Sequence, residues 1–208
     1  VDAYVISGSV VDPQSAPVAD ASLWLSQDRA VRTSKADAQG RFSFDDVLVG
    51  PMELVGRKDG FALGGLLGNV IGDADVYVVL GTPDSIRLRI IDGESKPIDG
   101  ARVRNLVVSD SFNVSVEDLV AFGFPPIRSE EDGKLVIDSL PKGSYASFSI
   151  AHRSFAEITL PTFPVGQELD LQLPYGVKVR GRVTNDAGQG VERARAARER
   201  HALDRLLL

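Results

Sequence analysis

Few side chains in this 208-residue sequence could carry out metal or nucleophilic chemistry. A zinc carboxypeptidase needs a His-x-x-Glu pair and a third His, yet the only histidines are His152 and His201. Arg-Ser-Phe follows the first and Ala-Leu-Asp follows the second, so neither begins such a pair. Cysteine is absent, which excludes thiol catalysis and a disulfide framework. We therefore predict no catalytic residue and no metal ligand, and we interpret both histidines as surface residues.

Other patterns that resemble functional motifs are incomplete. No G-x-S-x-G sequence is present to supply a serine nucleophile. The glycine-rich segment 64–68 lacks the lysine and the strand-to-helix setting of a phosphate-binding loop. The acidic clusters at Asp73/Asp75 and 130–132 lack the spacing of a calcium loop, so we interpret them as solvated turns. The sequence therefore predicts a protein that is not an enzyme and holds no cofactor.

The charge is unevenly distributed along the chain. The net charge is −6, and residues 176–208 carry eight Lys/Arg against four Asp/Glu. The remaining 175 residues carry 15 basic and 25 acidic groups, or −10. An acidic body does not suit nucleic acid, whose binding domains carry a basic patch. No apolar run approaches the 18 or more residues of a membrane span, so we expect no membrane insertion.

The sequence repeats itself at an offset of 80 residues. Ser15–Leu25 is S-A-P-V-A-D-A-S-L-W-L, and Ser95–Asn105 is S-K-P-I-D-G-A-R-V-R-N. The pattern begins a third time at Gly188–Ala196 as G-Q-G-V-E-R-A-R-A. A repeat of this length indicates tandem domains, because solenoid repeats span about 20–50 residues. We predict β-sandwich repeats at 1–82 and 83–175, followed by a truncated third repeat at 176–208.

The second repeat carries an insertion at 105–128. After it the offset rises from 80 to 93, so about thirteen residues are extra. Ser115 as an N-cap, with Glu117 and Asp118 in the first turn, resembles a helix start. An apolar loop on one repeat is a candidate interaction patch, formed here by Phe112, Phe122, Phe124, Pro125, Pro126 and Ile127. Alternatively, the insertion folds over an open end of its own sandwich or packs between the two domains.

Strand signals dominate up to residue 175. Short β-branched and aromatic runs, such as 4–11 and 76–80, alternate with Gly/Pro/Asp turns every eight to twelve residues. This spacing predicts an all-β protein of sandwiches or barrels. Residues 177–183 repeat the opening strand, whereas 192–208 are rich in helix formers and predict a helix-biased tail. We expect the two cores to contain Trp24, Phe42, Phe44, Phe61 and Leu80, and Leu135, Ile137, Tyr145, Phe148 and Leu171.

These motifs resemble those of the carboxypeptidase regulatory-like domain. In the first repeat they are P-V-A-D-A at 17–21, D-A-Q-G-R-F-S-F at 37–44 and D-G-F at 59–61. In the second they are P-I-D-G-A at 97–101 and D-G-K-L at 132–135. The resemblance implies tandem seven-stranded Greek-key β-sandwiches, related in fold to transthyretin and to the B-type repeats of bacterial collagen adhesins. It also implies an extracellular, periplasmic or cell-surface location.

Three functions are compatible with this sequence. The first is a non-catalytic spacer module of a bacterial exported or cell-surface protein. The second is a protein- or glycan-binding module that uses the 105–128 insertion. The third is an accessory region of an enzyme whose catalytic domain lies outside this chain. A dimer formed through the C-terminal tail is a further expectation. Buried Trp24 and Tyr145 would favour the spacer, and an exposed coplanar Trp/Tyr pair would favour glycan binding.

Overall fold

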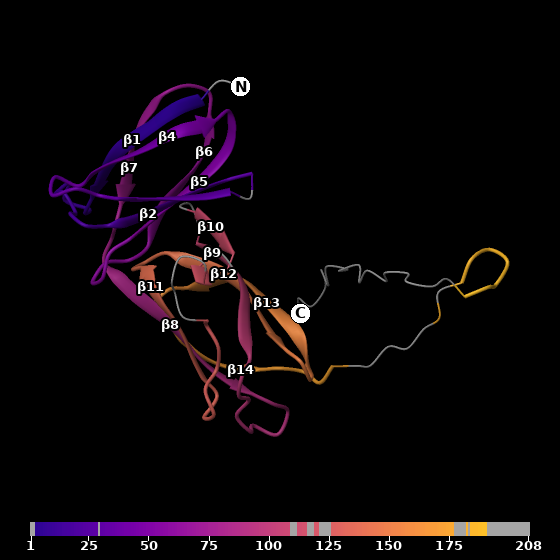
Figure 1. Ribbon diagram of the computed structural model, residues 1–208. Helices are drawn as coiled ribbons and strands as arrows, with labels where there is room; N and C mark the ends of the chain where they lie inside the picture. The colour runs from indigo at the N-terminus through magenta and orange to yellow at the C-terminus, as the bar shows by residue number, and fades with distance from the viewer. Residues whose placement is uncertain are drawn as a thin grey trace. The chain divides into compact units, whose positions relative to one another are not determined.

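A computed structural model describes most of the chain (Figure 1). The described residues are 3–28, 30–108, 112–115 (backbone), 119–120, 126–176, 182 and 184–190. They divide between two compact units, Val1–Gly176 and Val177–Leu208, which are described separately below. Within these residues, no helix has the length and apolar character needed to cross a membrane.

The first half of the larger unit is a seven-stranded β-sandwich. Its strands are β1 (Ala3–Val11), β2 (Ser22–Gln27), β3 (Ala30–Lys35), β4 (Arg41–Leu48), β5 (Gly50–Arg57), β6 (Gly64–Val70) and β7 (Ala74–Val79). One sheet has the order β4-β1-β7, with β7 parallel to β1, and the other has the order β3-β2-β5-β6. Because β5 returns to pair with β2 after β3 and β4, the connection is a Greek key.

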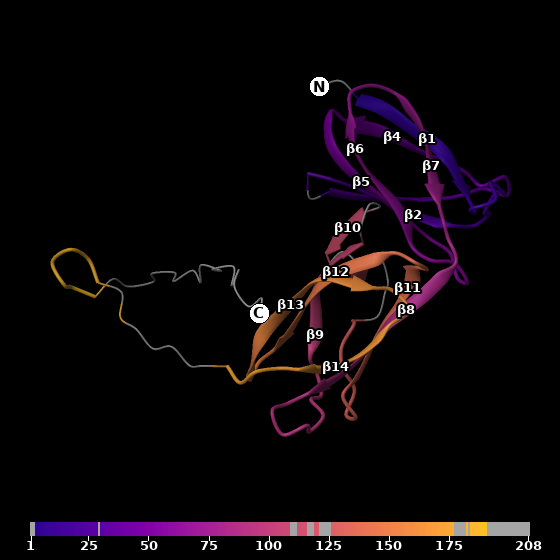
Figure 2. The same cartoon turned by 180° about the vertical axis from the view of Figure 1, so that it is seen from behind.

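The second half repeats this strand order. Its strands are β8 (Pro83–Ile91), β9 (Arg102–Val108), β10 (Phe112–Ser115), β11 (Lys134–Pro141), β12 (Tyr145–His152), β13 (Phe155–Pro164) and β14 (Glu168–Gln172). The sheets are β11-β8-β14, with β14 parallel to β8, and β10-β9-β12-β13. Strands β8 and β14 lie side by side in both views (Figures 1 and 2). The prediction of an all-β sandwich fold is confirmed. The predicted helix-biased tail and the strand at 177–183 fall largely outside the described residues.

Residues alternate between buried and exposed along the strands, and the buried ones form two cores. Two of the residues predicted for these cores are not buried. Phe42, Phe44, Leu80, Leu135, Ile137, Phe148 and Leu171 are buried as expected, and Phe61 packs at the edge of the first core. Trp24 is only half-buried, because its neighbours Leu23 and Leu25 point inward and successive strand residues face opposite sides. Tyr145 is 50% exposed for the same reason, since Ala146 takes the inward position. The burial of these two residues, which we expected of a spacer, is therefore not observed.

One turn recurs in atomic detail after the first strand of each sandwich and in the smaller unit. The Asp12 Oδ1 atom accepts hydrogen bonds from the backbone N–H groups two and four residues later, and so does the Asp92 Oδ1 atom. Asn185 in the smaller unit makes the same pair of bonds through its amide oxygen. The third residue after each of them has positive φ, at Ser15, Ser95 and Gly188. Such Asx turns fix the chain locally, so the side-chain oxygen explains the recurring Asp or Asn.

The first of the residues that the second sandwich has in addition to the first lies in β9, as its pairing with β12 shows. Between Val103 and Leu106, β9 has one residue more than the facing stretch of β12, which is a β-bulge. The corresponding strands β2 and β5 pair without a shift. The hairpin connection is also longer, since 109–111 joins β9 to β10 where 28–29 joins β2 to β3.

Most of the extra length interrupts an edge strand. In the first sandwich β3 pairs with β2 without a break, as far as Lys35. In the second, β10 ends at Ser115 and the pairing with β9 resumes at Arg128, which bridges Arg102. Part of the predicted insertion 105–128 is therefore strand. The longest addition lies between β10 and Arg128.

Backbone hydrogen bonds and apolar contacts join the two sandwiches. The backbone N–H of Leu63 donates to the Ser139 carbonyl at 2.8 Å, and Lys142 N–H donates to the carbonyl of Thr82, in the link between β7 and β8, at 2.9 Å. Val55 and Leu63 of the first sandwich are buried as part of the second hydrophobic core. The link between β7 and β8 is only three residues long, 80–82, and it limits how far the two strands can separate.

Candidate interaction surfaces

The structure describes only part of the predicted apolar patch. Phe112 opens β10, for which the backbone alone is described. Phe122, Phe124 and Pro125 lie outside the described residues. Pro126 is exposed, and Ile127 is half-buried against the second core. Where it is described, the patch is therefore anchored at one end to its own sandwich.

A further residue of the insertion contributes to the core. Leu119 is 2% exposed and belongs to the same cluster of buried residues as Val55 and Leu63. The cluster therefore combines side chains from the first sandwich, the second sandwich and the insertion. This packing favours the structural role that the sequence left open. The interaction role of the patch stays a prediction.

The two histidines belong to different units of the chain, His152 to the larger and His201 to the smaller. His152 ends β12, where its Nδ1 atom accepts a hydrogen bond from the Ser154 backbone N–H at 3.1 Å. His201 lies outside the described residues. Among the residues that are described, no three His, Asp or Glu side chains gather closely enough to hold a metal ion. The hydrogen bond from Ser154 occupies Nδ1, one of the two ring nitrogens of His152.

A groove of about 490 Å³ lies where β9 begins and β12 ends. Its walls come from two strands and the turns next to them, about fifty residues apart in the sequence: Asp99, Gly100, Arg102, Arg104, Ala151, His152 and Arg153. Three arginines and one carboxylate make it cationic. In the described part of the chain, none of these arginines forms an ion pair. We call it the second groove, after its sandwich.

The first sandwich has a groove of about 590 Å³ at the equivalent place. Its walls are Asp20, Ser22, Trp24, Lys35, Arg57, Lys58 and Asp59. The equivalence follows from pairing, because Ser22 faces Arg57 across the sheet as Arg102 faces Ala151. Lys35 lies 2.9 Å from the Asp20 carboxylate, and Arg57 lies 3.6 Å from Asp59. Two of the three cations in this first groove are therefore neutralised.

An aromatic stack lies beside the second groove. The His152 and Phe155 rings are 5.2 Å apart, and Phe155 stacks on Tyr175 at 5.2 Å with 27° between the ring planes. Tyr175 is held there by an isolated bridge to Phe155 and by the backbone bond from Ala156 N–H to the Pro174 carbonyl. Tyr175 remains 59% exposed, so part of the stack faces solvent.

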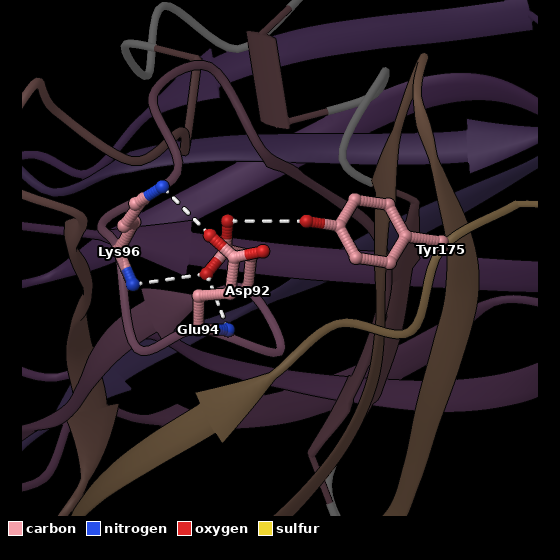
Figure 3. Close-up of polar contacts among 4 residues, drawn as sticks. All are labelled: Asp92, Glu94, Lys96 and Tyr175. Carbon is pink, nitrogen blue, oxygen red and sulfur yellow. Dashed lines mark hydrogen bonds and ion pairs between the residues drawn. The ribbon is translucent and has the colours of Figure 1, made fainter.

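Tyr175 also makes a hydrogen bond to the Asx turn of the second sandwich (Figure 3). Its hydroxyl donates to Asp92 Oδ2 at 3.4 Å, on the side opposite the turn's backbone N–H groups. The backbone N–H of Lys96 lowers the pKa of Asp92 below its ordinary value of 3.8, with a further contribution from Glu94 N–H. The Asp92 charge in turn raises the pKa of Tyr175 above 10.0. The exposed Lys96–Glu94 ion pair, at 2.7 Å, completes the cluster.

Sequence reasoning found neither groove. The Arg-x-Arg spacing of 102 and 104 was visible, but their partners at 152–153 come from a strand whose register the sequence does not give. One signal was available once the repeats were aligned. Asp59 of the first repeat corresponds to Arg153 of the second, a change from acid to base at one structural position.

Comparison with known proteins agrees with the fold of the first sandwich. Residues 5–81 match the family model of the carboxypeptidase regulatory-like domain. No curated protein sequence matches the chain. The match covers β1 to β7, so the motifs quoted from the first repeat are those of a β-sandwich domain.

Several solved structures resemble the chain weakly. The Bacillus anthracis TIE protein is 11% identical over 91% of this chain and 40% of its own, with a TM-score of 0.33. A streptococcal ancillary pilin is 11% identical over 85% of this chain and 63% of its own, with a TM-score of 0.36. The shaft pilin SpaA from Lactobacillus rhamnosus GG is 9% identical over 86% of this chain and 100% of its own, also at 0.36. The chain spans two fifths of the first of these proteins and less than two thirds of the second.

Proposed function

We propose that this chain is a non-catalytic structural module of a bacterial exported or cell-surface protein, in which two joined β-sandwiches act as a spacer. The joint between the sandwiches is the observation that supports the proposal. Leu63 and Val55 bury apolar surface across it, and the Leu63–Ser139 hydrogen bond links the two backbones. A spacer must transmit position from one end to the other, and a buried joint with a short link does this better than a flexible linker.

The surface location rests on the family resemblance of the first sandwich. The absence of cysteine is compatible with an exported bacterial protein, because such a chain needs no oxidative folding. The non-catalytic role is supported by the lack of a nucleophile–base pair in the sequence and of a metal-binding group among the described residues.

The test is a distance measurement across the joint. Because the chain has no native cysteine, two spin labels can be placed at the exposed positions Val49 and Val136 without removing any thiol. Pulsed electron paramagnetic resonance should give one narrow distance distribution. Leu63→Ala should broaden it, because the substitution removes buried contact at the joint, whereas the exposed Leu67→Ala should not. A broad distribution in the parent protein would mean that the sandwiches move independently, and it would overturn the spacer proposal.

The 105–128 insertion is the second candidate, as an interaction segment for a protein or glycan. The exposure of Pro126 beside the half-buried Ile127 supports it. A deletion that tests it must spare β10 and Leu119, since β10 pairs with β9 and Leu119 is in the core. Replacing Phe122, Phe124 and Pro125 by serine meets this condition. Loss of a ligand with an unchanged melting temperature would support the interaction role, and loss of folding would assign the segment to the scaffold.

A further inference from the structure

The two grooves occupy the same place on the same fold, yet their charges are arranged differently. In the first groove, Asp20 and Asp59 pair with Lys35 and Arg57. In the second, the positions of Ser22, Trp24 and Asp59 hold Arg102, Arg104 and Arg153. At these three positions one carboxylate is lost and three guanidinium groups are gained, while Ala151 and His152 stand in place of Arg57 and Lys58. The result is a net charge of +2 from the arginines and Asp99, on a chain whose body is acidic.

The surroundings of the second groove add positive charge. Arg128 bridges Arg102 on the neighbouring strand segment and is also exposed. Like charges directly opposite each other in a sheet destabilise it. The fold therefore bears an electrostatic cost at this place, and a bound anion would relieve it.

The chemistry of the wall suits an oxyanion. Guanidinium groups hold carboxylate, sulfate or phosphate through paired N–H donors. His152 contributes an additional donor, because its Nδ1 atom is already an acceptor for Ser154 N–H and so the neutral ring carries its proton on Nε2. The volume of about 490 Å³ exceeds a single ion and falls within the range of small-molecule sites, roughly 300–1,000 Å³.

The aromatic stack indicates what carries the oxyanion. His152 is shared between the groove wall and the stack, which leads from His152 through Phe155 to the partly exposed Tyr175 ring. The C–H face of a sugar ring packs on an aromatic ring while its acidic substituents reach donors nearby. We infer that the second groove is a binding site for an acidic saccharide, with Arg102, Arg104 and Arg153 holding its sulfate or carboxylate groups and Tyr175 contacting a sugar ring. This site is separate from the joint, so the inference does not depend on the spacer proposal.

The experiment compares the two grooves in the full-length chain. A heparin-derived tetrasaccharide is the acidic-saccharide probe, hexaglutamate the acidic-peptide probe and maltotetraose the neutral sugar, each measured by isothermal titration calorimetry in low salt. The tetrasaccharide should bind the parent protein, and maltotetraose should not. Arg153→Asp, which gives the second groove the residue of the first, should weaken binding at least tenfold. Asp59→Arg should create a second site, because that side chain is 95% exposed and the change replaces a carboxylate of the first groove with a guanidinium group.

A matched control separates the groove from general attraction. Arg182→Asp makes the same change in net charge at an exposed position of the smaller unit, and it should leave the affinity for the groove unchanged. Equal losses from Arg153→Asp and Arg182→Asp would show non-specific attraction and overturn the inference. Hexaglutamate binding as tightly as the tetrasaccharide would also overturn it, in favour of an acidic peptide. Tyr175→Ala should weaken saccharide binding without affecting hexaglutamate, and an equal effect on both probes would remove the sugar-stacking role.

Discussion

The two sandwiches share a strand order but distribute bulk differently across their cores. In the first, the aromatic rings of Phe42 and Phe44 come from β4 and lie 6.0 Å apart, edge to face. In the second, the corresponding strand β11 supplies Leu135 and Ile137. The second core takes its buried aromatic ring from the opposite sheet instead, as Phe148 on β12.

A glycine explains how the first core accommodates its rings. Gly8 pairs directly with Phe42, and a Cβ atom at Gly8 would lie 2.8 Å from the Phe42 ring and would collide with the Val76 carbonyl oxygen. At the same place in the second sandwich, Leu88 pairs with Leu135. The first core thus combines a large ring with a glycine, and the second core has two leucines of intermediate size in their place. The comparison shows that the fold depends on the inward pattern and the total volume, and that individual core residues can change.

The largest loss of stability is expected when a buried aromatic residue of either core is replaced by alanine. Phe42→Ala in the first sandwich and Phe148→Ala in the second should each lower the free energy of unfolding by about 3–5 kcal/mol, because both rings are buried and a cavity is left behind. Chemical denaturation followed by circular dichroism measures this. Val136→Ala, at an exposed strand position, is the control and should have little effect. A loss below about 1 kcal/mol at Phe42 would contradict its place in the core.

An intermediate effect is expected from filling the space at Gly8. Gly8→Ala should cost about 1–3 kcal/mol, because the new methyl group forces β7 or the Phe42 ring to move. Gly72→Ala is the matched control, since no other atom lies within 4 Å of a Cβ atom there. Adding Phe42→Leu to Gly8→Ala should restore only part of the loss, because the collision with the β7 backbone remains. Full restoration would show that the ring alone sets the requirement for glycine.

The sequence predicted the sandwich fold because repeated strands and turns carry a local signal. Asp12 and Asp92 each fix a turn through bonds to nearby backbone groups, so the spacing is visible in the chain itself. The matched strand pattern predicts Trp24 and Tyr145 in the core, but the phase of their strands places them outward. The grooves were missed for a different reason. They arise from the register between β9 and β12, and register depends on long-range packing.

The smallest expected effect concerns the turn that both sandwiches share and the tyrosine that closes it in the second. Asp92→Ala removes the acceptor of two backbone N–H groups and should lower the melting temperature, though less than either core substitution. Asp92→Asn should keep the turn, because Asn185 makes the same two bonds in the smaller unit. Asp12→Asn is the matched change in the first sandwich.

The pH dependence of Asp92→Asn distinguishes the charge from the geometry. Since the folded state lowers the pKa of Asp92, its carboxylate stabilises the fold fully above the ordinary value of 3.8, and this contribution is lost as the pH falls through the lower, folded pKa. The parent protein should therefore exceed Asp92→Asn in melting temperature at pH 7, and the two should converge in acid. At the alkaline end the raised pKa of Tyr175 works in the opposite sense: its neutral form stabilises the fold below 10.0, and that contribution disappears as the phenol ionises above this value. Asp92→Asn should bring the Tyr175 pKa back toward 10.0, because the negative charge of Asp92 is the largest cause of the raised pKa. Nuclear magnetic resonance titration of the Tyr175 ring measures this directly, and an unchanged Tyr175 pKa in the variant would show that the phenol and the carboxylate do not interact in solution.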